Sequence, residues 1–407
     1  MTGSASERPS ARARRRASLA LDQLPLLAYG FRPFFLLAAI FAALAVPLWL
    51  AAYMGALTLP SPLPTSLWHG HEMLFGYGAA VIAGFLLTAA PSWSGRPPVS
   101  GIGLAVLALI WLAGRLATSA GGGVPAIAAA VDLAFLPALA IVLVPALHTA
   151  PPRNRVFLPV LGVLLLANLG VHLDALDVLP SLGRIALRVA LDLFVLLIGL
   201  IGGRVVPAFT DNALAARGEP ARVRPSSLRD RLAIGSLVLL LLADLLGLVR
   251  AAGVVALAAA LLNAWRLYGW QGSRTLREPI LWVLHLGYLW LAVGLAWKGL
   301  VDLTEFLPPA DALHGLAIGA VGTMTLAIMS RATLGHTGRP LHAPPLVAAS
   351  YLLVGAAAIA RLAAPLAPAH GITLLVISGA LWSLAFAGFV IRLGPALVQP
   401  RPDGRPG

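Results

Sequence analysis

The chain has 407 residues, of which 59% are hydrophobic and only 11% charged, and its formal net charge is +13. A soluble domain carries about one-quarter charged residues, so this composition excludes an ordinary soluble protein. The chain contains no cysteine, which excludes disulfides, thiolate metal sites and covalent haem attachment through a CxxCH motif. Aromatic residues are not interleaved with the arginines, so we expect no nucleic-acid partner.

Continuous apolar runs recur along the chain, and each is long enough to cross about 30 Å of hydrocarbon as a helix. The strands of a membrane barrel would alternate apolar and polar residues, and these runs do not. The sequence therefore predicts an all-α, polytopic transmembrane helix bundle. The twelve predicted spans are 33–54, 72–90, 101–119, 124–147, 156–172, 184–207, 232–249, 251–268, 279–301, 311–330, 346–362 and 371–393. The break between the seventh and the eighth rests on Arg250 and Gly253.

Arginines indicate on which side of the membrane each loop lies. The N-terminal tail contains Arg8, Arg12, Arg14, Arg15 and Arg16, and further arginines recur in every second loop. Under the positive-inside rule this pattern places both termini in the cytoplasm. We expect one membrane domain at 24–398, a disordered basic cytoplasmic tail at 1–23 and a second disordered tail at 399–407.

Three predicted spans share weak internal similarity. The tripeptide Gly-Arg-Pro follows both the second and the tenth span at an offset of 243 residues, and this offset places His71 on His314. The motif GGRVVPAF at the end of the sixth span can be aligned with both, and Arg204 then matches Arg331. An interval of four helices suggests a 4+4+4 pseudo-repeat more than the 6+6 repeat of many transporters.

Polar residues gather at the predicted periplasmic ends of three spans. They are His69, His71, Glu72, His172 and His314. Ionisable groups at the edge of a membrane are costly and are functional candidates, although a single histidine can equally cap a helix or hydrogen-bond a neighbour. Neutral imidazole binds haem iron and copper. We therefore expect at least two of these histidines to bind metal, and we expect His71 and His314 to face one cofactor between them.

A second polar layer is expected near the cytoplasmic side. It consists of Arg204, Arg331, His285 and His336. Arg331 follows His314 by 17 residues, which is about 26 Å along a helix. The two arginines fit headgroup contact and a shared anion-binding role equally well, and His285 fits an interhelical hydrogen bond better than a metal ligand.

Two acidic residues, Asp132 and Asp192, fall inside the fourth and sixth predicted spans. Intramembrane carboxyl groups often belong to proton relays. The sequence alone gives no chain of partners that would complete such a path.

Five stretches of the chain resemble the NnrS family. They are GFRPFFLLAAIF (30–41), WHGHEMLFGYGAAVIAGFLLTA (68–89), GGRVVPAFTDN (202–212), LHLGYLW (284–290) and GTMTLAIMSRATLGHTGRPL (322–341). The resemblance implies a twelve-span bacterial inner-membrane protein that contains haem and copper and is associated with denitrification and nitric oxide tolerance. It implies His69, His71, His172, His285, His314 and His336 as candidate ligands, and Glu72, Arg204 and Arg331 as further cofactor-binding positions.

The favoured function is therefore a haem–copper membrane protein of the nitric oxide response, which binds a nitrogen oxide or protects against it. The haem is expected to be non-covalent and of b type, membrane lipid is the expected surrounding, and the redox partner is unknown. One alternative is a metal or haem transporter, and another is a membrane anchor for electron transfer. Whether the protein is an enzyme stays open.

The topology makes a direct prediction. A reporter fused to the C-terminus should give a cytoplasmic signal, and a reporter inserted between Asp302 and Asp311 should give a periplasmic signal, because the charge pattern puts these sites on opposite sides. The same signal from both fusions would contradict the predicted orientation.

Overall fold

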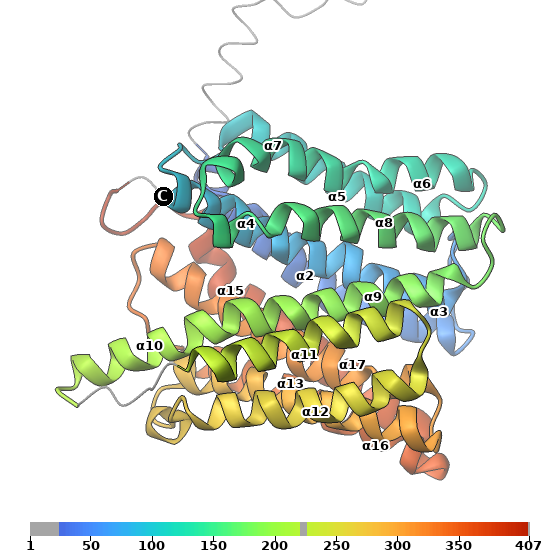
Figure 1. Cartoon of the computed structure of the whole chain (residues 1–407). Helices are drawn as coiled ribbons and strands as arrows, with labels where there is room; N and C mark the ends of the chain where they lie inside the picture. The colour runs from blue at the N-terminus through green and yellow to red at the C-terminus, as the bar shows by residue number, and fades with distance from the viewer. Residues whose placement is uncertain (1–23, 220–225, 406–407) are drawn as a thin grey trace, which may run out of the picture.

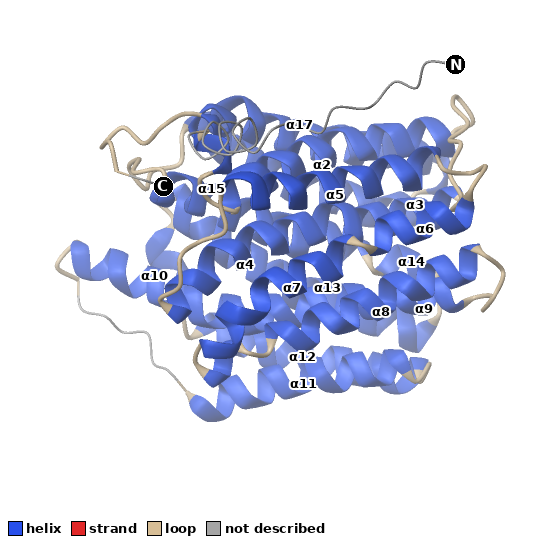
Figure 2. Ribbon diagram, turned by 90° about the horizontal axis from the view of Figure 1, so that it is seen from above, coloured by secondary structure: helices blue, strands red, loops and turns tan. Residues whose placement is uncertain are grey.

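The computed structural model describes residues 24–219 and 226–405, so the predicted tail at 1–23 lies outside the described residues. Within these ranges all regular structure is helical, and no strand occurs. Long helices pack side by side with neighbours running in opposite directions, as two perpendicular views show (Figures 1 and 2). The predicted all-α bundle is confirmed.

Twelve long helical segments follow one another within the described ranges. They are α2 (Phe31–Tyr53); α3 (Thr65–His71) with η2 (Glu72–Gly78) and α4 (Ala79–Ser94); α5 (Gly101–Ala120); α6 (Pro125–Leu133) with α7 (Phe135–Thr149); α8 (Phe157–Ala175); α9 (Leu182–Leu197) with η4 (Ile198–Gly202) and α10 (Gly203–Ala216); α11 (Ser227–Leu245); α12 (Val249–Tyr268); α13 (Pro279–Thr304); α14 (Pro309–Ala312) with η6 (Gly315–Gly322) and α15 (Thr323–His336); α16 (Pro345–Ala363); and α17 (Gly371–Val398). Eleven of them are long and apolar enough to cross a membrane. The exception, α11, carries four charged residues in its 19.

The break between α11 and α12 lies earlier than the sequence predicted. α11 ends at Leu245, α12 begins at Val249, and Gly247 between them has a φ of +67°, a left-handed conformation that favours glycine. Arg250 and Gly253, on which the prediction rested, both lie inside α12. Gly253 serves helix packing, because a Cβ there would lie 2.9 Å from the side chain of Leu303 on α13.

The second segment also begins earlier than predicted. Its helix starts at Thr65, directly after Pro64, and α3 continues without a break into η2. His71 and Glu72 therefore lie inside the segment and not at its mouth, and both side chains are fully buried. We call the end of the bundle at which α3 and α9 begin and α8 and α13 finish the outer end, after its predicted orientation.

π-helical turns occur in the second, sixth and tenth segments, as η2, η4 and η6. Such turns make up well under 1% of residues in proteins and often mark functional sites. The offset of 243 residues carries η2 onto 315–321, which falls within η6 (315–322). This correspondence supports a relation between the second and tenth segments. The 4+4+4 repeat as a whole stays a prediction.

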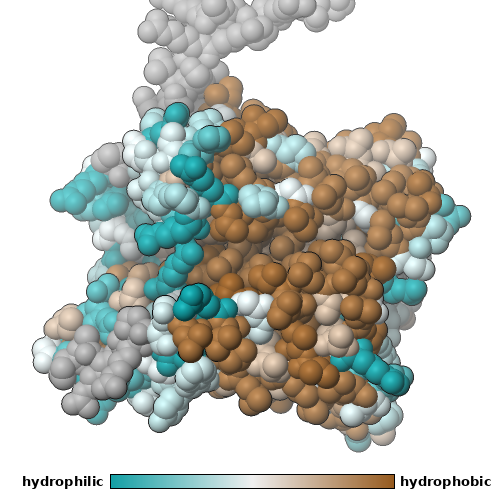
Figure 3. Space-filling view, in the orientation of Figure 1, coloured by the Kyte–Doolittle hydropathy of each residue, from teal (hydrophilic) through white to brown (hydrophobic). Residues whose placement is uncertain are grey.

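The second segment lies at the centre of the bundle. In its most apolar stretch 83% of residues are buried, compared with 39% in α5 at the periphery. Large apolar side chains on the outer helices, such as Leu109, Ile141 and Leu261, are more than 60% exposed. On the face shown in Figure 3, apolar side chains cover the middle while hydrophilic ones gather toward the two ends, as expected for a surface in contact with lipid.

The first and last long helices close the bundle against each other. Arg32 near the start of α2 is fully buried, and its Nη1 donates to the backbone carbonyls of Leu397 and Gln399, each at 2.9 Å. These carbonyls at the end of α17 have no partner within their own helix. Trp382 Nε1 of α17 also donates to the carbonyl of Ala42 in α2, at 3.0 Å.

Close helix packing around η6 predicts a selective effect of one added methyl group. A Cβ at Gly294 of α13 would lie 2.8 Å from the backbone nitrogen of Leu316, which cannot move independently of its helix. Gly294→Ala should therefore lower the free energy of unfolding in detergent by about 1–3 kcal/mol. Gly162→Ala on α8 is the control, because a Cβ there meets nothing within 4 Å. Equal stability of the two variants would contradict this packing.

Candidate functional site

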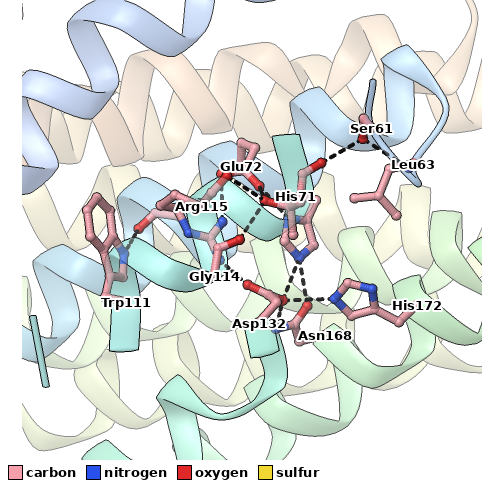
Figure 4. A network of polar contacts seen from close by, with 12 residues as sticks. Ser61, Leu63, His71, Glu72, Trp111, Gly114, Arg115, Asp132, Asn168 and His172 are labelled. Carbon is pink, nitrogen blue, oxygen red and sulfur yellow. Dashed lines mark hydrogen bonds and ion pairs between the residues drawn. The ribbon is translucent and has the colours of Figure 1, made fainter. Parts of the chain in front are cut away.

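A buried polar cluster lies near the outer end, where four helical segments meet (Figure 4). We call it the His71 cluster. Its members are His71 and Glu72 of α3 and η2, Arg115 and Thr118 of α5, Asp132 of α6, and Asn168 and His172 of α8. Each of these seven residues is at most 4% exposed. Buried polar groups at this depth in a membrane protein must satisfy one another, and here they do so across four segments.

His71 makes hydrogen bonds through both ring nitrogens. Its Nδ1 lies 3.0 Å from Glu72 Oε1, while its Nε2 lies 3.1 Å from Asp132 Oδ2 and 2.8 Å from Asn168 Oδ1. His172 Nε2 contacts the same oxygen of Asp132 at 2.8 Å. Two imidazoles from different helices are therefore directed at one carboxylate oxygen.

Arg115 joins the two carboxylates of the cluster. Its Nη1 lies 2.6 Å from Glu72 Oε2, and its Nη2 is paired with Asp132 Oδ1. Thr118 donates a further hydrogen bond of 2.7 Å to Glu72 Oε1. One guanidinium thus fixes both acidic side chains, and it does so where no water competes for them.

The His71 cluster has the composition of a metal site. One ligand atom each from His71, Asp132 and His172 can be chosen so that all three lie within 4.8 Å of one another. Two imidazoles and one carboxylate suit zinc, copper or non-haem iron. Glu72 then contacts the other nitrogen of His71, and a carboxylate in this place commonly orients a ligating histidine.

A second pair of histidines lies at the same end of the bundle. The rings of His69 and His314 are nearly parallel, at 13°, and their centroids are 6.4 Å apart. His314 Nδ1 donates to the carbonyl of Ala310 at 2.9 Å, which leaves its Nε2 unprotonated in the neutral ring. His69 stacks on Trp49 at 4.2 Å, and its buried Nδ1 has no hydrogen-bond partner among the described residues. Nδ1 of His69 and Nε2 of His314 are therefore the candidate ligand nitrogens of this pair.

The four outer histidines thus form two pairs. His71 pairs with His172 and His69 with His314, so the predicted pair of His71 and His314 is not the one that forms. The reason is helical geometry, because residues two positions apart point about 200° away from each other around a helix. His69 faces α14 and η6, and His71 faces α6 and α8.

The predicted inner layer does not form a comparable cluster. Arg204 is exposed, and its Nη1 lies 3.5 Å from Oδ1 of Asn154. The guanidinium of Arg331 lies 3.7 Å from the ring centroid of Phe209. His285 Nε2 lies 2.9 Å from Thr210 Oγ1, which is an interhelical hydrogen bond between α13 and α10. Their roles in cofactor binding stay predictions.

His336 lies apart from the other histidines, at the end of α15. It is exposed, its ring lies 5.4 Å from that of Phe31, and its carbonyl accepts a hydrogen bond of 3.0 Å from Arg401. No described residue places a second imidazole beside it.

Sequence reasoning missed part of the His71 cluster. The sequence predicts no partner for Asp132, and it does not point to Arg115 or Asn168 as site residues. All three fall inside apolar spans, where charged and amide side chains are rare. If every charged or amide residue inside a predicted span were treated as a candidate site residue, all three would be identified. Nothing in the sequence, however, pairs one of them with another.

The ion pairs of Arg115 predict a large loss of stability when the cation is removed. Arg115→Met leaves Glu72 and Asp132 buried without their shared cation, and breaking a buried pair in this way costs about 3–5 kcal/mol. Denaturant titration of the purified protein measures this loss. Arg96→Met, at an exposed loop position, should change the unfolding free energy by less than about 0.5 kcal/mol. A similar small change in both variants would contradict the role of Arg115.

Comparison with known proteins supports the resemblance noted in the sequence. A family model described as NnrS protein matches residues 25–401, which is nearly the whole chain. No curated protein matches the chain. The matched range includes every long helix, the His71 cluster and the His69–His314 pair. At the family level the protein is a membrane protein of the nitric oxide response, because the chain belongs to the NnrS protein family.

Proposed function

We propose that this protein is a haem- and copper-containing membrane protein that binds a nitrogen oxide near the outer end of the bundle. The observation that carries the proposal is the convergence of His71, Asp132 and His172 from three separate segments on one buried point. A purely structural role needs only one hydrogen-bond partner for each histidine. Here two imidazoles are directed at the same oxygen.

Copper fits the His71 cluster by the chemistry of its donors. Imidazole nitrogens are common copper ligands, and the cluster adds a carboxylate and the amide oxygen of Asn168. Arg115 would balance the negative charge of Glu72 and Asp132 and keep both side chains in place. Thr118 and Glu72 would hold the imidazole of His71 in one orientation.

Haem fits the second pair of histidines. His69 and His314 come from different segments; Nδ1 of His69 has no hydrogen-bond partner among the described residues, and the hydrogen bond from Nδ1 of His314 leaves its Nε2 as an acceptor. The absence of cysteine requires that any haem be held without covalent attachment. Trp49, stacked on His69, supplies a flat apolar surface beside the ligand nitrogen. Bound haem or copper would supply a coordination position for a nitrogen oxide.

An apolar cavity among the central segments suits a small uncharged ligand. It has a volume of about 80 Å³ and lies among α4, α8, α9, η4, η6 and α15. Val81, Phe85, Phe194 and Met324 are among its lining residues. A diatomic gas that partitions into lipid could occupy this space, whereas a metal ion or a charged oxyanion would lose its hydration there.

Metal and haem stoichiometry of the purified protein tests the proposal. His172→Ala removes an imidazole of the His71 cluster and Asp132→Asn replaces its carboxylate with a neutral amide, so the copper content should fall by more than half in both. His69→Ala and His314→Ala should lower or abolish the Soret absorbance, because the haem would lose an imidazole that holds it. Membrane abundance, measured in parallel, separates lost ligation from lost folding.

Matched controls come from exposed histidines of the same chain. His148→Ala should keep full copper, and His342→Ala and His370→Ala should keep full haem. Full copper in both cluster variants, or an unshifted Soret band in both haem variants, would contradict the corresponding assignment. A colourless, metal-free wild-type preparation would instead favour the transporter alternative, in which the histidines hold their cargo only transiently.

A further inference from the structure

A second buried cluster of charged residues lies among α9, α11 and α13, away from the His71 cluster, as the positions of α5 and α11 in Figure 1 show. We call it the Asp192 cluster. Its members are Arg188 and Asp192 of α9, Asp244 of α11, and Lys298 and Asp302 of α13. The three carboxylates and Lys298 are each at most 4% exposed.

Four of the five members are paired with an opposite charge. Lys298 Nζ lies 3.0 Å from Asp244 Oδ2 and 2.5 Å from Asp302 Oδ2. Arg188 Nη1 lies 3.5 Å from Asp244 Oδ1. Two cations thus balance two carboxylates, as expected for charges held inside a membrane.

Asp192 is the exception. It is 2% exposed, and neither of its carboxyl oxygens has a hydrogen-bond donor among the described residues. It follows Arg188 by four residues, so the two side chains lie on the same face of α9, and Arg188 contacts Asp244 on α11. The carboxyl group of Asp192 therefore faces that of Asp244, the charged group that acts on it most strongly. Two carboxylates in contact at a buried position cannot both stay ionised, and a proton between them turns the contact into a hydrogen bond.

Among the described residues, the cations that act on Asp192 are already paired with another carboxylate. The remaining groups that act on it are Lys298 and Arg188, both already engaged by Asp244. The charged groups on the other elements packed against α9 already interact with other residues. His71, Glu72 and His172 belong to the His71 cluster, His69 and His314 form their own pair, and Asp174 accepts backbone hydrogen bonds from Ser181 and Gly183.

We propose that Asp192 and Asp244 share one proton and form a proton-binding site inside the membrane. Three carboxylates face two cations, and one proton removes the excess negative charge. Protonation transfers H⁺ from a hydronium ion to a carboxyl oxygen, forms one O–H bond and leaves water behind. The proton would stay between the two carboxyl groups, since Asp192 has no other described partner.

The position of the cluster indicates where the proton enters. Asp302 lies two residues before the end of α13 and Asp244 one residue before the end of α11, both at the outer end. Asp192 lies ten residues after the start of α9, which is about 15 Å along the helix. The ionised chain of Asp302, Lys298 and Asp244 therefore links the outer end to the protonated pair.

A separate polar network approaches from the opposite end through the same helices. Nε of Arg266 on α12 lies 2.7 Å from Oδ1 of Asp230 at the start of α11. Nη1 of the same arginine donates to the carbonyl of Gly199 in η4, also at 2.7 Å. Gly199 follows Asp192 by seven residues, about 10 Å along the helix. Among the described residues no hydrogen bond joins this network to Asp192, whereas Lys298 connects Asp244 to Asp302 at the outer end. The outer end is therefore the side from which the proposed site takes its proton.

Infrared spectroscopy tests the proposal directly, without any need for bound metal. At neutral pH the wild-type protein should show the carbonyl band of a protonated carboxylic acid, and Asp192→Asn should remove it while keeping the fold, because the amide is neutral like the protonated acid. Asp177→Asn is the matched control. Asp177 is exposed, has a positive φ that asparagine also adopts, and lies outside the Asp192 cluster, so this variant should keep the band.

Two results would overturn the proposal. One is a wild-type spectrum at neutral pH with no acid band that Asp192→Asn removes, since both carboxyl groups would then be ionised. The other is a wild-type melting temperature that rises with added Na⁺ or Ca²⁺ at constant ionic strength and no longer does so in Asp192→Asn. A bound cation would in that case replace the proton. Asp244→Asn provides a second variant, and it should also remove or shift the band.

Discussion

The burial of charge inside a membrane is the constraint on which this structure depends. A charged side chain in an apolar bundle must find its partners within the bundle, and the partners come from helices that are distant in sequence. Arg115 illustrates the consequence, because its pairs with Glu72 and Asp132 fix α5 against the second and fourth segments. The positions of the imidazoles follow from these ion pairs, since His71 contacts both carboxylates that Arg115 holds.

The two charged clusters solve this constraint in different ways. The His71 cluster uses neutral and charged donors from four segments, and its histidine nitrogens meet around a shared oxygen. In the Asp192 cluster two cations face three carboxylates, so a proton has to complete the balance. One arrangement suits a metal ion, and the other suits a hydrogen ion. Their separation within the bundle allows each to respond to its own ligand.

The sequence predicted much of the fold because hydrophobic length is a local property. The number and order of the segments and the shared end of four histidines followed from it. The His69–His314 and His71–His172 pairs did not, since they depend on which way each side chain points around its helix and on which helices are neighbours. The break at Gly247 was missed for a related reason. A turn of three residues leaves little polar signal between two apolar runs. Arg250 gives a polar signal at the wrong position, because it lies inside α12.

The contact between α2 and α17 has a consequence for biosynthesis. Arg32 lies on α2, while the carbonyls that it binds lie 365 and 367 residues later, at the end of α17. Until α17 is made, the guanidinium has to stay solvated at the membrane surface or hold a lipid phosphate. The bundle therefore closes only after α17 has been made, and a chain truncated before α17 would expose both Arg32 and the apolar face of α2 to the quality-control machinery of the membrane.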